Sequence, residues 1–249
     1  MMLQVKEATM RFGGLTAVKS ASLTVKEGSI TGLIGPNGAG KTTLFSMISG
    51  FLVPSEGRIH YLDQDVTTVP THHRAQSGLA RTFQIVQPFA GLSTLENIVV
   101  GAFLRHKDRD QAEAVARKVA AQVGLTKDLD RPAAGLTVAG RKRLELARAL
   151  ATEPRLLLLD EVLAGLNPSE IRDIIPVIQG IRQEGVTILM IEHVMQAVMS
   201  LCEYVYVLAQ GQMIAEGVPA DVVSNTQVVE AYLGHGAAAR LASKEKAHA

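Results

Sequence analysis

The segment SITGLIGPNGAGKTT, residues 29–43, decides the fold class. Its first six residues are mostly apolar and predict a short buried strand, and residues 35–42 follow the pattern GxxxxGK[ST]. Glycines in such a turn let successive backbone N–H groups point at one anion, which side chains would obstruct. The helix expected from about Gly40 to Ser49 adds the positive end of its dipole. The segment therefore predicts a phosphate-binding loop between a strand and a helix.

Two side chains in this loop carry the expected chemistry. Lys41 supplies a point charge for the β- and γ-phosphates of a nucleotide, and Thr42 offers a hydroxyl to Mg²⁺. The predicted nucleotide-binding residues of the loop are Asn37, Gly38, Ala39, Gly40, Lys41, Thr42 and Thr43. Such a loop alone is compatible with GTPases, kinases, helicases and motors, so the rest of the chain has to distinguish among them.

An acidic pair follows a run of four leucines, Leu156–Leu159. Such a run is typical of a central parallel strand buried on both faces, and α/β proteins place ligands at the carboxyl ends of these strands. Asp160 is therefore a candidate Mg²⁺ ligand, directly or through water. Glu161 is the candidate general base that aligns the attacking water and accepts its proton.

The composition argues against several other classes of function. The chain has 249 residues, a net charge of +1 and no tryptophan, which does not favour a nucleic-acid-binding surface. Its single cysteine, Cys202, excludes an internal disulfide and a cysteine-based metal site. No apolar run approaches the roughly 18 residues that span a bilayer, so any role at a membrane requires a partner.

The order of the predicted elements indicates one α/β domain over residues 1–234. We expect its core at residues 1–87 and 151–234, with short strands near the N-terminus forming an antiparallel β edge. Helical patterns predict an inserted α-helical lobe at about residues 88–150, with helices at 95–104, 110–123 and 141–152. The expected fold class is therefore α/β, with a helical lobe and an antiparallel edge added to the phosphate-binding core.

Three segments give less regular expectations. Pro176 lies inside the helix predicted over residues 169–184, where an interior proline costs about 3 kcal/mol, so we expect a bend or a broken turn. Residues 235–249 are small, polar and charged, and we expect a disordered tail. The basic run at 141–143 is expected to form a solvent-exposed helix face.

With these residues in view, the chain resembles the ATP-binding subunits of ABC transporters over nearly its whole length. Five further features match in the family's order: an adenine-stacking aromatic, a glutamine loop, a signature loop, a D-loop and a switch histidine. They fall, respectively, at Phe12 with Val18 beside it, Gln84, residues 136–140, residues 164–167 and His193. The resemblance implies a P-loop NTPase core, in which Gln84 senses Mg²⁺ and the attacking water and His193 contacts the γ-phosphate.

The signature loop departs from the family's usual Leu-Ser-Gly-Gly-Gln and reads Leu-Thr-Val-Ala-Gly at residues 136–140. Thr137 keeps a hydroxyl that can cap the following helix and bind phosphate. Ala139 adds a methyl group where the family's backbone approaches the γ-phosphate. This methyl lowers ATP affinity unless the loop shifts so that Gly140 compensates. Val162 replaces a common proline, with little expected effect on the chemistry.

The resemblance also implies ligands and partners. The ligands are ATP and Mg²⁺, and the signature loop completes the ATP site of a second ABC ATPase subunit, identical or related, in a two-fold dimer. Integral membrane permeases are the expected partners, a periplasmic binding protein is an indirect one, and nucleic acid is not. The expected location is peripheral, on the cytoplasmic face of the inner (cell) membrane.

Two segments indicate the branch of the family. Residues 71–84 and 229–234 are similar to uptake ATPases for branched-chain and other hydrophobic amino acids, although urea and amide importers stay open. An alternative is a lipopolysaccharide-export-type ATPase, which ends in a similar Tyr-Leu-Gly stretch; the segment ARTFQ at 80–84 argues against it. Another is a non-transport ABC ATPase, which a single cassette without heptads does not favour.

Overall fold

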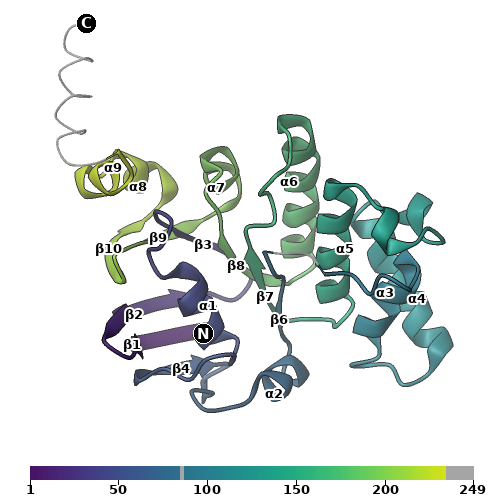
Figure 1. Ribbon diagram of the computed structural model, residues 1–249, viewed down its shortest axis with the longest axis horizontal. Helices are drawn as coiled ribbons and strands as arrows, with labels where there is room; N and C mark the ends of the chain where they lie inside the picture. Colours follow the sequence, from purple (N-terminus) through teal and green to yellow (C-terminus); the bar gives the residue numbers. More distant parts are fainter. Residues whose placement is uncertain (85–86, 234–249) are drawn as a thin grey trace, which may run out of the picture.

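The computed structural model describes residues 1–84 and 87–233 and contains two β-sheets flanked by helices (Figure 1). The smaller sheet is antiparallel, with the strand order β2-β1-β4-β5. Its strands are β1 Leu3–Phe12, β2 Leu15–Val25, β4 Glu56–Tyr61 and β5 Gln64–Asp65. β1 pairs with both β2 and β4, and both pairings contain register shifts. This sheet is the antiparallel edge that the sequence predicts.

The larger sheet has six strands in the order β10-β9-β3-β8-β7-β6. Its strands are β3 Ile30–Ile34, β6 Leu79–Arg81, β7 Leu156–Asp160, β8 Thr187–Ile191, β9 Tyr204–Ala209 and β10 Gln212–Gly217. β10 pairs antiparallel with β9, and the other neighbours are parallel. The carboxyl ends of β3, β7 and β8 therefore meet at one edge of the sheet.

Strand β7 shows why the centre of this sheet requires a continuous apolar run. All five of its residues are buried. Leu157 and Leu159 belong to the core that contains helices of the outer layer, whereas Leu156 and Leu158 belong to the core shared with the smaller sheet. Because side chains alternate along a strand, β7 contributes to both cores, and apolar residues are needed on both faces.

Helices cover both faces of the larger sheet (Figure 1). α1 Lys41–Ile48 packs in the core shared with the smaller sheet, and α6 Pro168–Gln183 and α7 Met195–Leu201 pack on the opposite face. α3, α4 and α5 pack against one another at the right of Figure 1 and form the helical layer that the sequence predicts. The bounds of the remaining helices are α2 Thr71–Gln76, α3 Thr94–Ala102, α4 Arg109–Gln122, α5 Val138–Leu150, α8 Pro219–Ser224 and α9 Thr226–Leu233.

Two helices differ from the sequence-based expectations. α6 is continuous although Pro176 lies inside it, so the expected broken turn is absent. Pro176 is exposed, and the carbonyl group that it leaves unpaired can bond to water, which limits the cost. α5 begins at Val138, three residues earlier than expected. Thr137 caps it, as its hydroxyl accepts a hydrogen bond from the Gly140 N–H at 3.1 Å.

The expectation of a solvent-exposed basic face at residues 141–143 is wrong. Lys142 is only 7% exposed, and Arg143 Nη1 donates to the Val123 carbonyl at 2.7 Å. Charge patterning cannot reveal that carbonyl groups of other segments cover this part of α5. The predicted tail at 235–249 lies outside the described residues, and within the described ranges no helix has the length and apolarity to cross a bilayer.

Arg74 fastens α2 to two other segments of the fold. It is 1% exposed, and its Nη1 donates to the carbonyl oxygens of Met47 at 2.9 Å and Ile48 at 2.6 Å. These two carbonyls lie at the end of α1, where a helix leaves its acceptors unpaired. Its Nε and Nη2 donate to the carbonyl oxygens of Val69 and Thr67. A single buried guanidinium thus donates to four backbone acceptors, of which the Met47 carbonyl oxygen also accepts from the Gly50 N–H at 3.2 Å.

The substitution Arg74→Met is expected to lower the free energy of unfolding by about 3 kcal/mol or more, because each buried acceptor left without a donor costs about 1–3 kcal/mol. Urea denaturation measures this loss. The control is Arg58→Met, which removes an exposed ion pair with Asp65 that is worth about 0–1 kcal/mol. Equal small losses in the two variants would contradict the role of Arg74.

Candidate functional site

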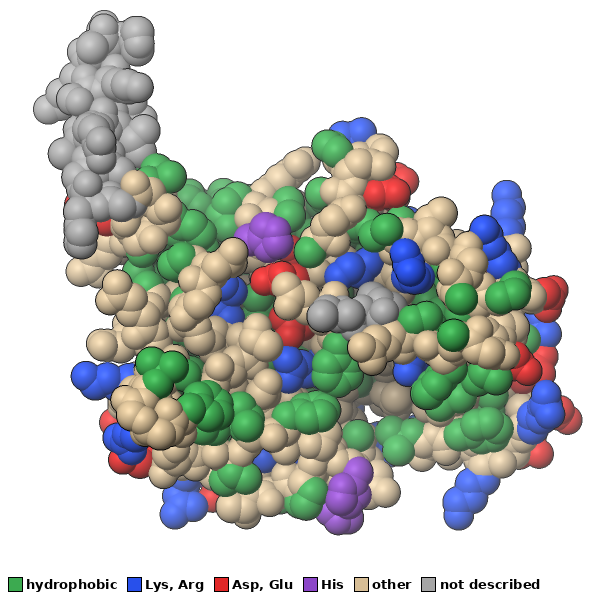
Figure 2. Space-filling model, in the orientation of Figure 1, with side chains coloured by type: hydrophobic (Ala, Val, Ile, Leu, Met, Phe, Trp, Pro, Cys, Tyr) green, Lys and Arg blue, Asp and Glu red, His purple; other side chains and the backbone are tan. Residues whose placement is uncertain are grey.

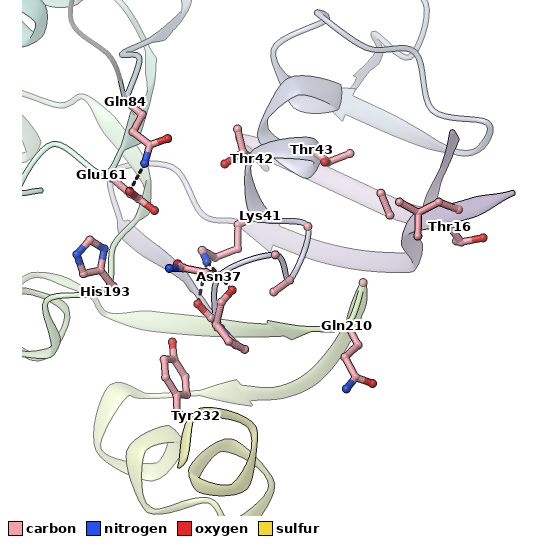
Figure 3. Close-up of a pocket in the computed structure, with 18 residues that line it drawn as sticks. Thr16, Asn37, Lys41, Thr42, Thr43, Gln84, Glu161, His193, Gln210 and Tyr232 are labelled. Atoms are coloured by element: carbon pink, nitrogen blue, oxygen red, sulfur yellow. Dashed lines mark hydrogen bonds between the residues drawn. The ribbon is translucent and has the colours of Figure 1, made fainter. Parts of the chain in front are cut away.

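A cavity of about 910 Å³ lies at the edge of the larger sheet where β3, β7 and β8 end (Figure 3). Residues 35–40 join β3 to α1 and form one wall. Glu161 and His193 follow β7 and β8 and face the same cavity. This is the edge at which open α/β sheets bind ligands. The lining is completed by Leu15, Thr16, Ala17, Lys41, Thr42, Thr43, Gln84, Gln210, Gly211 and Tyr232.

At two glycines the backbone of the loop lies so close to neighbouring backbone that a side chain would not fit. Gly35 and Gly40 have φ angles of +148° and +103°. A Cβ atom at Gly40 would lie 2.5 Å from the Ala17 carbonyl oxygen, and one at Gly35 would collide with the Leu208 carbonyl oxygen. The loop therefore presents backbone around the cavity, as the predicted anion nest requires.

Lys41 is held over this loop. Its Nζ donates to the carbonyl oxygens of Gly35 at 2.8 Å and Pro36 at 3.0 Å. Burial lowers the pKa of Lys41, and the nearby carboxylates of Glu161 and Asp160 oppose this effect. The ammonium group is already at the mouth of the anion nest, where it can exchange two carbonyl oxygens for phosphate oxygens.

Asp160 offers one unpaired oxygen beside this cavity. It is 1% exposed, and its Oδ2 accepts a hydrogen bond from Arg81 Nη2 at 2.8 Å. Its Oδ1 is buried without a hydrogen-bond partner among the described residues. Burial raises the pKa of Asp160, and the Arg81 guanidinium opposes that rise. Thr42 and Gln84 line the same adjoining cavity as Asp160. Hydroxyl, amide and carboxylate oxygens fit a hard divalent cation.

Three side chains predicted to act in hydrolysis converge on the cavity (Figure 3). Gln84 Nε2 donates to Glu161 Oε2 at 2.7 Å, and His193 lies on the same side of the cavity as this pair. The backbone of Glu161 has a φ of +50°, a left-handed conformation unusual for a residue other than glycine. Its N–H donates to the Ile191 carbonyl oxygen at 3.0 Å, which fixes the start of this turn against the end of β8.

The residues predicted to contact adenine do not line the cavity. Phe12 is 47% exposed at the end of β1, and Val18 is fully buried beside the backbone of Gly40. Thr16 and Ala17, between these two positions on the same hairpin, line the cavity instead. The stacking role of Phe12 therefore stays a prediction.

The signature-loop residues lie at the start of α5, away from this chain's own phosphate-binding loop. Thr137, Ala139 and Gly140 are absent from the cavity lining. Val138 is 49% exposed, and Thr137 is also exposed. The N-terminus of α5 is thus accessible to another molecule.

Tyr232 and Gln210 line the cavity although no sequence pattern predicted them there. Tyr232 reaches the cavity from α9, and its side chain points towards the phosphate-binding loop (Figure 3). Burial raises the pKa of Tyr232, and the backbone of Gly35 opposes that rise. No local pattern links residue 232 to residue 35, because only the packing of α9 onto the larger sheet brings them together.

Glu192 forms a buried connection behind the cavity. It is 1% exposed, and its Oε1 accepts a hydrogen bond from the Leu163 N–H at 2.9 Å. Burial raises the pKa of Glu192 to about 7. Glu192 directly precedes His193 in the chain, so this hydrogen bond ties the segment that carries His193 to the turn that follows Glu161.

The fold and this cavity define a P-loop ATPase. The chain belongs to the ABC transporter family, because residues 18–164 match the family model described as ABC transporter. Residues 212–238 match a second model, described as branched-chain amino acid ATP-binding cassette transporter. The chain thus has the ATP-hydrolysing activity of this family, and within the family it resembles the branched-chain amino acid group.

Relatives in bacteria agree with this assignment. The chain is 40% identical to the high-affinity branched-chain amino acid transport ATP-binding protein BraF of Pseudomonas aeruginosa, over 93% of this chain and 97% of the relative. It is 38% identical to LivG of Salmonella typhimurium, a protein with the same description, over 94% and 98%. It is 35% identical to the lipopolysaccharide export system ATP-binding protein LptB of Escherichia coli, over 93% and 97%.

Solved structures show the same architecture. A nucleotide-free ATP-binding cassette from an ABC transporter superposes with a TM-score of 0.86 at 31% identity, covering 94% of this chain and 99% of the other. An ATP-binding cassette in its ADP conformation superposes with a TM-score of 0.85 at 32% identity, with the same coverage. The predicted fold class is confirmed.

Replacing Glu192 with Gln is expected to stabilise the protein above neutral pH. In the folded chain the carboxyl group keeps its proton up to about pH 7, whereas in the unfolded chain it ionises near its ordinary pKa. The stability of the unsubstituted protein therefore falls as pH rises between these values, by about 3 kcal/mol for a shift of this size. Glu192→Gln still accepts the Leu163 hydrogen bond and escapes this loss.

Urea denaturation at pH 5 and pH 8 measures the difference. The stability gain of Glu192→Gln over the unsubstituted protein should be larger at pH 8. The control is Glu27→Gln, at a side chain that is 62% exposed. A gain that is equal at both pH values would contradict the buried, protonated state of Glu192.

Proposed function

We propose that this chain is the ATPase subunit of an amino-acid importer, with branched-chain amino acids as the main substrates. In this role it drives transport through partner permeases in the membrane. The match of residues 212–238 to the branched-chain model and the identity to BraF and LivG support this function. The transported molecule touches the permeases and a periplasmic binding protein rather than this chain, so the ATPase acts on it indirectly.

ATP is proposed to bind with its phosphates in the loop after β3. Lys41 leaves the carbonyl oxygens of Gly35 and Pro36 to contact the β- and γ-phosphates, and the backbone around it donates hydrogen bonds. The residues proposed for this contact are Asn37, Gly38, Ala39, Gly40, Lys41, Thr42 and Thr43. The base is proposed to stack on Phe12 above Val18, after a side-chain movement of Phe12 towards the cavity.

A divalent ion is proposed to be held by Thr42, Gln84 and Asp160. The unpaired Asp160 Oδ1 supports this assignment, since a buried carboxylate oxygen without a donor is rare. When bound, Mg²⁺ neutralises charge on the β- and γ-phosphates. Arg81 holds the other oxygen of Asp160 and so fixes the orientation of the carboxylate.

Hydrolysis is proposed to use Glu161 as the general base. The observation that carries this role is the 2.7 Å hydrogen bond between Gln84 Nε2 and Glu161 Oε2 inside the cavity. The amide orients the carboxylate, which can then accept a proton from water that attacks the γ-phosphate. His193 is proposed to contact the γ-phosphate from the same side.

A second ABC ATPase subunit is proposed to complete the site. Thr137, Ala139 and Gly140 lie outside this chain's own cavity, and the accessible N-terminus of α5 is suited to the phosphate of a partner's ATP. The Ala139 methyl group lies in the first turn of α5. It is expected to weaken this contact relative to glycine.

An apolar groove supports docking of the permeases. It is lined by Phe51, Phe83 and Val100, all more than 40% exposed, together with residues of α2, α3 and α5. Phe51 and Phe83 make an edge-to-face contact at 5.7 Å. Figure 2 shows hydrophobic side chains on this face of the molecule, over α3 and α4 and over the smaller sheet. The proposed location is therefore peripheral, at the cytoplasmic face of the inner membrane.

Glu161→Gln is expected to abolish ATP turnover while ATP binding persists, and to trap an ATP-bound dimer. The amide keeps the hydrogen-bonding shape but cannot accept the proton. Phosphate release, nucleotide affinity and size-exclusion chromatography with ATP measure the three effects. Glu27→Gln serves as the control. Turnover by Glu161→Gln near the unsubstituted rate would remove Glu161 from the role of base.

Purification of the chain from gently solubilised native membranes tests the transport function. Recovery with two polytopic permeases and a related ATPase, identified by mass spectrometry, is the expected result, and the associated binding protein is then screened with branched-chain amino acids. Recovery with lipopolysaccharide-export components would favour the function of the relative LptB. Recovery only from the soluble fraction, with ribosomes or DNA-repair proteins, would overturn transport.

A further inference from the structure

Lys142 connects the signature helix to two segments that carry hydrolytic side chains. It lies on α5, about one turn beyond the Thr137 cap, and is 7% exposed. Its Nζ donates to the backbone carbonyl oxygens of Gln84 and Glu161, each at 3.1 Å. Two of the three donors of one ammonium group are thus directed at the main chain of two residues whose side chains are hydrogen-bonded to each other at the cavity.

The charge of Lys142 is balanced by the acids around it. Burial lowers the pKa of Lys142, while the nearby acidic groups Glu192, once ionised, and Glu161, Asp160 and Glu145 oppose this change. Burying an ammonium group is costly unless it is paired and hydrogen-bonded. The two carbonyl groups and the surrounding acidic groups provide that compensation. Lys142 is therefore a buried, hydrogen-bonded lysine with a structural contact, unlike a solvent-exposed lysine.

The backbone that Lys142 contacts needs such support. Glu161 adopts a φ of +50°, and a residue other than glycine keeps this conformation only where its surroundings hold it. Its carbonyl oxygen accepts from Lys142 and from the Ala164 N–H at 3.2 Å. Lys142 thus gives α5 a direct hydrogen bond to this turn.

We propose that Lys142 is a positioning residue, which fixes the main chains of Gln84 and Glu161 to α5 and so transmits displacements of α5 to the pair that aligns the attacking water. This inference rests on the roles proposed above for Gln84 and Glu161. In the proposed dimer, residues 137–140 at the start of α5 touch the partner's ATP. Lys142 therefore links occupancy of the partner's site to the geometry of hydrolysis in its own chain.

Hydrogen–deuterium exchange tests the mechanical link without nucleotide. Lys142→Met keeps the aliphatic stem and removes the donors. Backbone amides at residues 82–84 and 161–164 should exchange at least about threefold faster, because the segments lose their tether. The matched control is Arg141→Met, which removes the same charge one residue earlier and leaves the Lys142 contacts in place. Unchanged exchange in Lys142→Met, or equal increases in both variants, would overturn the proposal.

Steady-state kinetics tests the functional consequence. Lys142→Met should lower kcat at least about tenfold while KM for ATP changes less than about threefold, since small misplacements of a catalytic pair are costly. Lys142→Arg should recover most of the lost kcat, and Arg141→Met should match the unsubstituted protein. An equal loss of kcat in Lys142→Arg and Lys142→Met would overturn the positioning role. A higher KM with an unchanged kcat in Lys142→Met would overturn it as well.

A third variant keeps the test decisive if Lys142→Met does not fold. Lys142→Gln retains one donor group. Its kcat should be lower, and its exchange at residues 82–84 and 161–164 faster, than in Lys142→Arg. Values for Lys142→Gln equal to the unsubstituted protein would overturn the proposal. Because the exchange experiment needs no ATP, failure of hydrolysis in the unsubstituted chain would count against the proposed function and leave the link intact.

Discussion

The structure depends on the position of the phosphate-binding loop and of several charged side chains at one edge of a sheet whose centre is apolar. Leu156–Leu159 and the strands beside them are buried on both faces, so the sheet is rigid and its carboxyl-end edge is fixed. Lys41, Asp160 and Glu161 project from that edge into one region. Burial shifts the pKa of Lys41 downward and that of Asp160 upward. Both shifts reflect the same desolvation, which a bound anion and cation would relieve.

Direct contacts join this edge to the helical layer. Arg81 holds Asp160 and lies 5.4 Å from the Phe83 ring centroid, at the apolar groove. Lys142 holds the main chains of Gln84 and Glu161 from α5. A change in the position of the helical layer therefore acts on Asp160, the proposed cation ligand, and on Glu161, the proposed base, by different routes. This arrangement suits an ATPase whose hydrolysis must respond to partner proteins.

The sequence allowed the fold class and the phosphate-binding loop to be predicted, because these depend on local patterns. The loop at 35–42 and the acids after Leu159 are each encoded within a few residues, while the grouping of Gln84 and His193 with them came from family resemblance. Contacts between distant segments were not predictable. Lys142 was expected in solvent, and Tyr232 had no assigned place in the site. Proline statistics also misled at Pro176, because an exposed position lets water bond the freed carbonyl group.

The most direct test of the account is the thermal stability of the chain with Mg²⁺ and saturating AMP, ADP or ATP, measured by calorimetry. Ligands that bind only the folded state raise Tm according to their affinity. Because most of the binding free energy is expected from contacts of the β- and γ-phosphates with the loop around Lys41, ATP and ADP should raise Tm. AMP, which lacks both of these phosphates, should leave Tm almost unchanged. An equal increase with AMP would contradict the central role of the loop.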